Sequence, residues 1–184
     1  MYEYSGRALI FGASGGIGIT FSKFLENRLG TENVLKVSRS FDGFEISDEE
    51  SVLKFSESIK GPFNLIINAT GVLQTSLEGP EKTIDAVKQR SMIDIMAINA
   101  IGPALLLKNF YKKLDKTKFS VFINLSARVG SITDNRLGGW ISYRSSKAAL
   151  NQIIKTSSIE INRRNKNAIC VGLHPGTVKT SFTE

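Results

Sequence analysis

Cysteine and histidine are nearly absent from this chain, with one residue of each among 184. An intramolecular disulfide is therefore impossible, and no Cys/His cluster is available to hold a structural metal ion. The single cysteine, Cys170, lies in an apolar stretch, residues 168–171. We expect its thiol to be buried and unreactive.

Long apolar runs are also scarce. The first apolar segment, residues 8–11, is followed at once by glycines, so the sequence predicts neither a signal peptide nor a membrane span. We therefore expect a cytoplasmic protein with no membrane partner. With 41% hydrophobic and 22% charged residues, the chain has the composition of one globular domain over residues 1–184.

Acidic residues are fewer than basic ones, 17 against 24, which gives a formal charge of +7. The basic residues are scattered, and only small groups occur, at residues 112–113 and 163–166. We interpret these groups as solvated helix surfaces and expect no nucleic-acid partner. The positive balance favours a phosphorylated cofactor without identifying one.

Short apolar stretches alternate with amphipathic segments. We expect strands at residues 7–11, 33–38, 63–68, 120–125 and 168–173. We expect helices at residues 17–25, 52–59, 92–114 and from about Tyr143 to Arg163. Residues 47–50 would open the second of these, with acidic residues in its first turn. This alternation predicts an α/β fold, a doubly wound parallel sheet with helices on both faces.

A glycine-rich turn follows the first predicted strand and opens the first predicted helix. It reads Gly12-Ala13-Ser14-Gly15-Gly16-Ile17-Gly18. Small residues there let the backbone approach a pyrophosphate at the helix N-terminus, so the segment predicts a dinucleotide site. The spacing differs from the common G-x-G-x-x-G, and a flexible glycine turn is the alternative.

Tyr143 and Lys147 are four residues apart, so on a helix they lie one above the other. An ammonium beside the phenol favours phenolate, and we expect it to lower the pKa of Tyr143 from about 10. Such a tyrosine can exchange protons with a substrate. Taken alone, however, this spacing is common on solvated helix faces.

Several motifs occur together along the chain: Gly12-x-x-x-Gly16-Ile17-Gly18, Asn68-Ala69-x-Gly71, Asn99, Ser126 and Tyr143-x-x-x-Lys147. In this order and approximate spacing they resemble the short-chain dehydrogenase/reductase family over essentially the whole chain. Residues 174–180 resemble the family's Pro-Gly segment, which passes the nicotinamide. Residues 126–131 and 134–140 resemble the C-factor-like bacterial branch.

The resemblance implies roles for four residues. Tyr143 would protonate the carbonyl oxygen during reduction, or act as base in reverse, and Lys147 would lower its pKa and hold the nicotinamide ribose. Ser126 would donate a hydrogen bond to the substrate oxygen, and Asn99 would hold a water linking Lys147 to solvent. The alternatives are a strand-end turn serine and a helix asparagine satisfied by backbone.

The implied cofactor contacts gather at the predicted strand ends. They are Gly12, Ser14, Gly15, Gly16, Ile17, Ser38, Arg39, Asn68, Ala69, Thr70, Gly71, Tyr143, Lys147, Pro175, Gly176, Val178 and Thr180. Residues 68–71 would line the adenosine side. The adenine contact is open between Glu45 and backbone, because relatives commonly carry an aspartate there.

The end of the second strand bears on cofactor choice. An NAD site usually offers a carboxylate to the adenosine ribose, whereas this chain has Ser38-Arg39-Ser40. A guanidinium suits phosphate geometry, so we expect NADP(H) to be preferred over NAD(H), with Arg39 as the main contact and Ser38 as helper. A solvated loop arginine is the alternative.

These features together predict an oxidoreductase that transfers hydride between NADP(H) and a small-molecule carbonyl or secondary alcohol. The alternative is a dinucleotide-binding signalling or regulatory protein with incidental or no turnover. Relatives commonly pair through long helices, here residues 92–114 and 143–163, so we expect a homo-oligomer. Relatives also continue past the Pro-Gly segment, and we expect this chain to lack their C-terminal strand and helix. We expect this sequence to be incomplete, and a shortened member of the family is the alternative.

Overall fold

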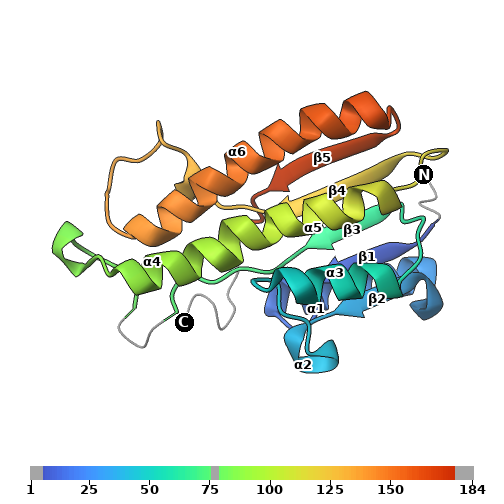
Figure 1. Ribbon diagram of the computed structural model, residues 1–184, viewed down its shortest axis with the longest axis horizontal. Helices are drawn as coiled ribbons and strands as arrows, with labels where there is room; N and C mark the ends of the chain where they lie inside the picture. The colour runs from blue at the N-terminus through green and yellow to red at the C-terminus, as the bar shows by residue number, and fades with distance from the viewer. Residues whose placement is uncertain (1–5, 76–78, 177–184) are drawn as a thin grey trace.

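Five parallel strands form a single sheet in the computed structural model of the protein, which describes residues 6–75 and 79–176. The strands are β1 (Ala8–Phe11), β2 (Val34–Val37), β3 (Leu65–Asn68), β4 (Ser120–Leu125) and β5 (Ala168–Leu173). Their order across the sheet is β2-β1-β3-β4-β5 (Figure 1). Each strand lies within a predicted stretch, and the doubly wound parallel sheet is confirmed.

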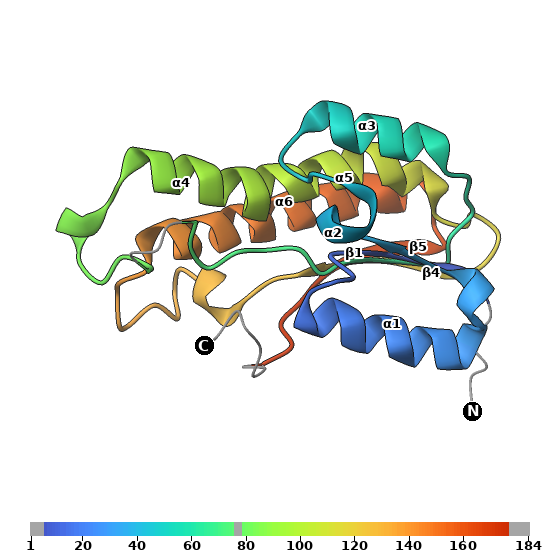
Figure 2. The same cartoon turned by 90° about the horizontal axis from the view of Figure 1, so that it is seen from below.

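Helices cover both faces of this sheet, as predicted. They are α1 (Gly16–Leu29), α2 (Arg39–Asp42), α3 (Glu49–Ser58), α4 (Gln89–Met96), α5 (Gly102–Phe110) and α6 (Ile141–Arg164). Figure 2 shows α1 on one face, whereas α3, α5 and α6 lie on the other. The short helix α2 lies outside the stretches for which we expected a helix.

The core is divided by the sheet into two apolar layers. The smaller layer packs Ala8, Ile10 and Val34 against Leu25 of α1. The larger one lies under α3, α5 and α6 and holds a cluster of four phenylalanines with ring centroids 4.9–6.2 Å apart, namely Phe11, Phe44, Phe55 and Phe110. Because successive strand residues face opposite sides, the short apolar strands supply both layers.

The helix expected over residues 92–114 is present but is not α-helical throughout. A π-helical turn, Ala97–Ile101, separates α4 from α5, and a 3₁₀ turn, Tyr111–Lys113, follows α5. Pro103 has no N–H to give the carbonyl four residues earlier, and the Gly102 N–H bonds the Ala97 carbonyl five residues earlier. The break places Asn99 inside the π-helical turn.

The continuous helical stretch Gln89–Lys113 is long and apolar enough to cross a membrane by length and composition. Its residues Ile95, Ala100, Leu106 and Phe110 are buried within the protein. Leu106 and Phe110 belong to the larger core layer, so this side of the stretch packs into the core, whereas Ile93 and Ile101 are exposed.

Candidate active site

The glycine turn after β1 brings backbone, not side chains, to the end of the sheet. Gly12 has φ +77°, and a Cβ there would lie 2.9 Å from the backbone of Ala69 and Thr70. Gly18 is as restricted, because a Cβ would lie 2.1 Å from the Gly12 carbonyl oxygen. Only glycine allows α1 and β3 to approach the turn this closely.

The first turn of α1 is open to solvent. Ser14, Gly15 and Gly16 are exposed, Ile17 is half-buried, and the N-cap residue, Gly15, has no side chain with which to cap the helix. The first turn also carries no acidic residue. Uncapped N–H groups at a helix N-terminus attract anions, so these residues fit the pyrophosphate of a dinucleotide.

The end of β3 forms a turn stabilised by its own asparagine. The Asn68 Oδ1 accepts hydrogen bonds from the N–H and the hydroxyl of Thr70, at 3.1 and 2.6 Å. Its Nδ2 donates to the Asn124 Oδ1 on β4 at 3.0 Å. Ala69 continues the pairing with β1, since its N–H donates to the Phe11 carbonyl. These bonds fix the backbone that leads to Gly71.

Tyr143 and Lys147 lie on the same side of α6 and are both buried, with 7% and 4% exposed. The Lys147 Nζ donates to the Leu125 carbonyl at the end of β4, at 3.0 Å, and lies 5.8 Å from the centre of the Tyr143 ring. Helical spacing and the carboxyl end of the sheet thus place the pair where a ligand of this fold would bind.

The pKa of Tyr143 differs in direction from our expectation. Burial raises the pKa of Tyr143 to about 12 and lowers the pKa of Lys147 to about 8. The prediction of a lowered tyrosine pKa is therefore wrong for this structure, because burial removes water from around the phenol and disfavours its charged form. The spacing in the sequence carries no information on burial.

Asn99 is 1% exposed and joins three elements. Its Oδ1 accepts from the Val72 N–H at 2.8 Å, and its Nδ2 donates to the Val72 carbonyl at 2.7 Å and to the Ser146 hydroxyl at 3.0 Å. A Cβ at Gly71 would lie 3.4 Å from the Asn99 Oδ1 and 3.5 Å from the Lys147 Nζ. The structure therefore brings Gly71, Asn99 and Lys147 together.

Ser126 lies just after β4, and its hydroxyl donates to the Asn151 Oδ1 at 2.6 Å. Asn151 is on α6, one turn after Lys147. The hydroxyl hydrogen that Ser126 would offer a substrate is therefore given to a side chain in this structure. Asn151 was not among the predicted site residues.

The residues predicted to select the cofactor lie at the end of β2. Ser38 is buried and is the N-cap residue of α2. Its hydroxyl accepts from the Phe41 N–H at 3.2 Å and contacts the Ser40 hydroxyl at 3.1 Å. The Arg39 side chain is 82% exposed, and its Nη1 lies 3.8 Å from the Glu45 Oε2. Arg39 is free to turn toward an anion, with Glu45 as a competing partner.

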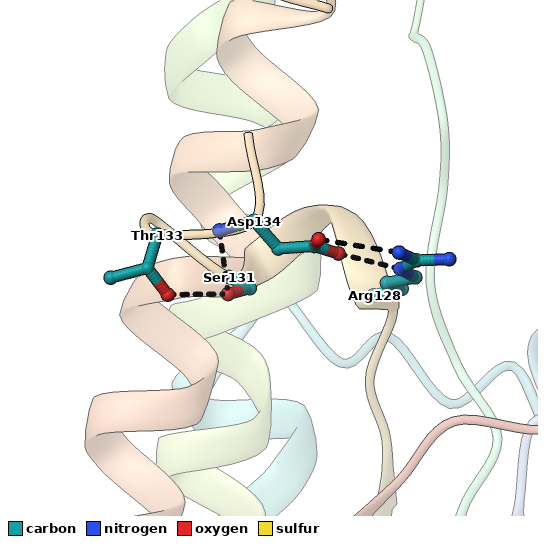
Figure 3. Close-up of polar contacts among 4 residues, drawn as sticks. All are labelled: Arg128, Ser131, Thr133 and Asp134. Carbon is teal, nitrogen blue, oxygen red and sulfur yellow. Dashed lines mark hydrogen bonds and ion pairs between the residues drawn. The ribbon is translucent and has the colours of Figure 1, made fainter. Parts of the chain in front are cut away.

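The connection from β4 to α6 is held by an ion pair. The Arg128 guanidinium binds both carboxylate oxygens of Asp134, at 2.5 and 3.2 Å, while the Ser131 hydroxyl accepts from the Asp134 N–H and contacts Thr133 (Figure 3). Hydrogen bonding to Arg128 holds the pKa of Asp134 below its usual range. Gly130 lies directly on α6, where a Cβ would be 2.8 Å from the Lys147 carbonyl carbon.

Two further residues beside Tyr143 carried no sequence signal. Glu81 and Ser142 are buried and hydrogen-bonded to each other across 61 positions of sequence. Their spacing fits none of the motifs that we sought.

Of the cofactor contacts expected after β5, Pro175 and Gly176 are exposed, and Val178 and Thr180 lie outside the described residues.

The buried Cys170 thiol takes no part in this arrangement. Burial raises its pKa to about 12, as expected for an unreactive core cysteine.

Comparisons of the sequence with a family model and with known proteins point to the same family. Residues 30–184 match the model of a family described as short chain dehydrogenase. The chain is 32% identical to the C-signal protein of Myxococcus xanthus, over 66% of this chain and 69% of that protein. It is 28% identical to an uncharacterised oxidoreductase of Schizosaccharomyces pombe, over 94% and 74%.

A similar solved structure is the NADPH-bound carbonyl reductase from chicken fatty liver. The two are 28% identical, with a TM-score of 0.78 over 97% of this chain and 82% of that one. An NADP-bound short-chain dehydrogenase/reductase from Burkholderia multivorans has a TM-score of 0.79 at 21% identity.

Proposed function

Since the chain belongs to the short-chain dehydrogenase family, we propose that it is an NADP(H)-dependent enzyme that reduces a carbonyl or oxidises a secondary alcohol. The observation that carries this proposal is the buried pair of Tyr143 and Lys147 at the carboxyl end of β4, beside Gly71 and Asn99. A buried acid with a buried cation at the ligand-binding edge is the pattern of a proton-transfer site.

The bound nicotinamide would supply or accept the hydride. Tyr143, whose pKa is about 12, stays protonated at neutral pH and has a proton to give to the oxygen of a carbonyl. Lys147 would stabilise the negative charge that this leaves on the phenol oxygen, since its Nζ is on the same side of α6. Ser126 would turn from Asn151 to donate to the same substrate oxygen, and Asn99 orders the segment that carries Gly71.

Replacement of the phenol hydroxyl tests this assignment. Tyr143→Phe should lower NADPH oxidation with a panel of aldehydes, ketones and quinones by about 100-fold or more, because the proton donor is lost. Its affinity for NADPH should stay within about threefold of the wild-type value. Equal turnover by wild type and variant would contradict the role of Tyr143.

A preference for NADP(H) is supported by the position of Arg39 and by the NADPH-bound relative at 28% identity. Arg39→Asp should weaken NADPH binding about tenfold or more, because a charge-assisted hydrogen bond to phosphate contributes about 1.5 kcal/mol or more. The matched control is Arg163→Asp, which removes an exposed arginine at the far end of α6. An unchanged NADPH affinity, with a wild type that prefers NADH, would overturn the preference.

A second candidate is a dinucleotide-binding signalling or regulatory protein, favoured by the 32% identity to C-signal. Tight NADPH binding without turnover of any compound in the panel would support it over the enzyme. Absence of saturable dinucleotide binding by the wild-type protein would contradict both candidate functions.

The proposed assembly is a homodimer through α5 and α6. These helices flank a surface hollow of about 410 Å³ whose lining includes Leu107, Tyr111 and Ile161. Light scattering that shows a monomer over the working concentration range would exclude this dimer.

A further inference from the structure

Glu81 is a buried carboxylate outside the residues assigned above. It lies before α4, is 8% exposed, and binds the first turn of α6. The Ser142 hydroxyl donates to its Oε1, and the Ser142 N–H donates to its Oε2 at 3.4 Å. Ser142 is fully buried and immediately precedes Tyr143.

The backbone around Glu81 contacts the same helix start. The Trp140 N–H donates to the Glu81 carbonyl at 2.5 Å. Gly139 packs on the same stretch, since a Cβ there would lie 3.5 Å from the Glu81 oxygen and 3.6 Å from the Lys82 oxygen. Segments 81–82 and 139–142 are therefore joined through both backbone and side chain.

The start of α6 lacks the usual local means of stabilisation. Trp140 occupies the N-cap position in the left-handed region, at φ 54° and ψ 43°, and provides no side-chain cap. The first turn of α6 also contains no acidic residue. Free N–H groups and the positive end of the helix favour a carboxylate, and Glu81 brings one from a distant segment.

The catalytic side chain is next to this contact. Tyr143 follows Ser142, and its ring lies 6.3 Å from the Trp140 ring in an edge arrangement. A shift of the first turn of α6 would move the Tyr143 hydroxyl relative to the strand ends. Misplacement by about 1 Å can cost about 100-fold in rate.

We propose that Glu81 is a positioning residue, which fixes the first turn of α6 and thereby the Tyr143 hydroxyl. This inference rests on the proposed function. Residues 81–82, which precede α4, would thereby influence proton transfer without contact between Glu81 and substrate.

The test compares Glu81→Ala, Glu81→Gln and Ser142→Ala with Glu50→Gln. Glu50 is the matched control, because it is an exposed carboxylate on α3, paired with Lys54 at 2.7 Å and outside the hollow between α5 and α6. Glu81→Ala should lower kcat about 10–100-fold while the NADPH dissociation constant changes less than about threefold. Ser142→Ala should lower kcat in the same direction, and Glu81→Gln, which keeps one acceptor oxygen, should recover part of the loss.

Two measurements without turnover accompany the kinetics. Fluorescence titration counts NADPH sites per chain, so that a loss of folded protein is separated from a loss of kcat. Amide hydrogen exchange of the cofactor-free protein should quicken at residues 141–146 in Glu81→Ala and stay unchanged at 155–160.

The outcomes separate the two proposals. If Tyr143→Phe abolishes turnover while Glu81→Ala keeps kcat within about twofold of wild type, the inference on Glu81 is wrong and the function stands. The inference on Glu81 is also wrong if kcat in Glu81→Ala falls only in proportion to the number of NADPH sites per chain. It is wrong as well if amide exchange at residues 141–146 is the same in Glu81→Ala and wild type. If wild type and Tyr143→Phe are equally inactive, the proposed function fails, and the exchange result alone then decides whether Glu81 fixes α6.

Discussion

Lys147→Met should make the cofactor-free protein more stable at neutral pH, although it removes a proposed catalytic residue. Burial lowers the pKa of Lys147 from 10.5 to about 8. This difference corresponds to an unfavourable contribution of about 3 kcal/mol to the free energy of folding with the lysine charged. Methionine carries no charge and has a similar length.

The gain is reduced by a lost hydrogen bond. The Lys147 Nζ donates to the Leu125 carbonyl, which methionine leaves without that donor at a cost of about 1 to 2 kcal/mol. We therefore expect a net stabilisation of about 1 to 2 kcal/mol. For a chain of this length that is about 2 to 8 °C in melting temperature.

The dependence on pH identifies the cause. Between pH 8 and 10.5 the unfolded chain keeps the lysine proton that the folded protein has lost, so wild-type stability rises with pH over this window. The unfavourable contribution is complete below pH 8 and disappears at 10.5. Thermal unfolding at pH 7 and at about pH 9.5 should show the difference between Lys147→Met and wild type shrinking.

Lys155→Met, an exposed position two turns further along α6, is the control. If Lys147→Met is less stable than wild type at pH 7, or if its difference from wild type is the same at both pH values, desolvation of the ammonium does not govern this site.

Three further outcomes follow from the site. The kcat of NADPH-dependent reduction should stay constant near neutral pH and fall above about pH 8, because Lys147 then loses the charge that stabilises the Tyr143 oxygen. A kcat that stays constant up to about pH 10 would contradict this role of Lys147. Gly18→Ala should destabilise the protein by about 3 kcal/mol in urea unfolding, because the new Cβ would lie 2.1 Å from the Gly12 carbonyl oxygen. Gly15→Ala, whose Cβ would lie 3.4 Å from the same oxygen, should cost less than about 1 kcal/mol. Equal effects of the two substitutions would refute the close contact at Gly18. Asn99→Ala removes three hydrogen bonds from a buried site and should cost about 2 to 3 kcal/mol by the same assay, and a neutral effect would show that water replaces the amide.

The sheet was predictable because each strand is a short apolar run bounded by polar or glycine residues. β4 and β5 have the predicted bounds, and β1, β2 and β3 are slightly shorter than predicted. The interruption of the long helix was not predicted, since its apolar residues keep a helical spacing across the π-helical turn. Pro103 indicates that the helical hydrogen bonds change near this point, but it does not indicate which residues form the π-helical turn.

The site was predictable only where its residues are close in sequence or belong to a known pattern. Helical spacing alone places Tyr143 and Lys147 on one face of α6. Their pKa values depend on burial, which the spacing does not encode, and so the predicted direction for Tyr143 was wrong. Glu81 and Asn151 contact the site through partners 61 and 25 positions away, and no local pattern reports such pairs.

The π-helical turn at Ala97–Ile101 also marks a point where this helical segment can change in length. A π-helical turn holds one residue more than an α-helical turn, so deletion of one residue here would restore α-helical hydrogen bonds and leave α4 in nearly the same orientation relative to α5. The change would fall on the turn itself, where Asn99 contacts Val72. An aligned homologue with a one-residue gap at this point should therefore keep the core contacts of α4 but have a differently arranged site, even where Tyr143 and Lys147 are retained.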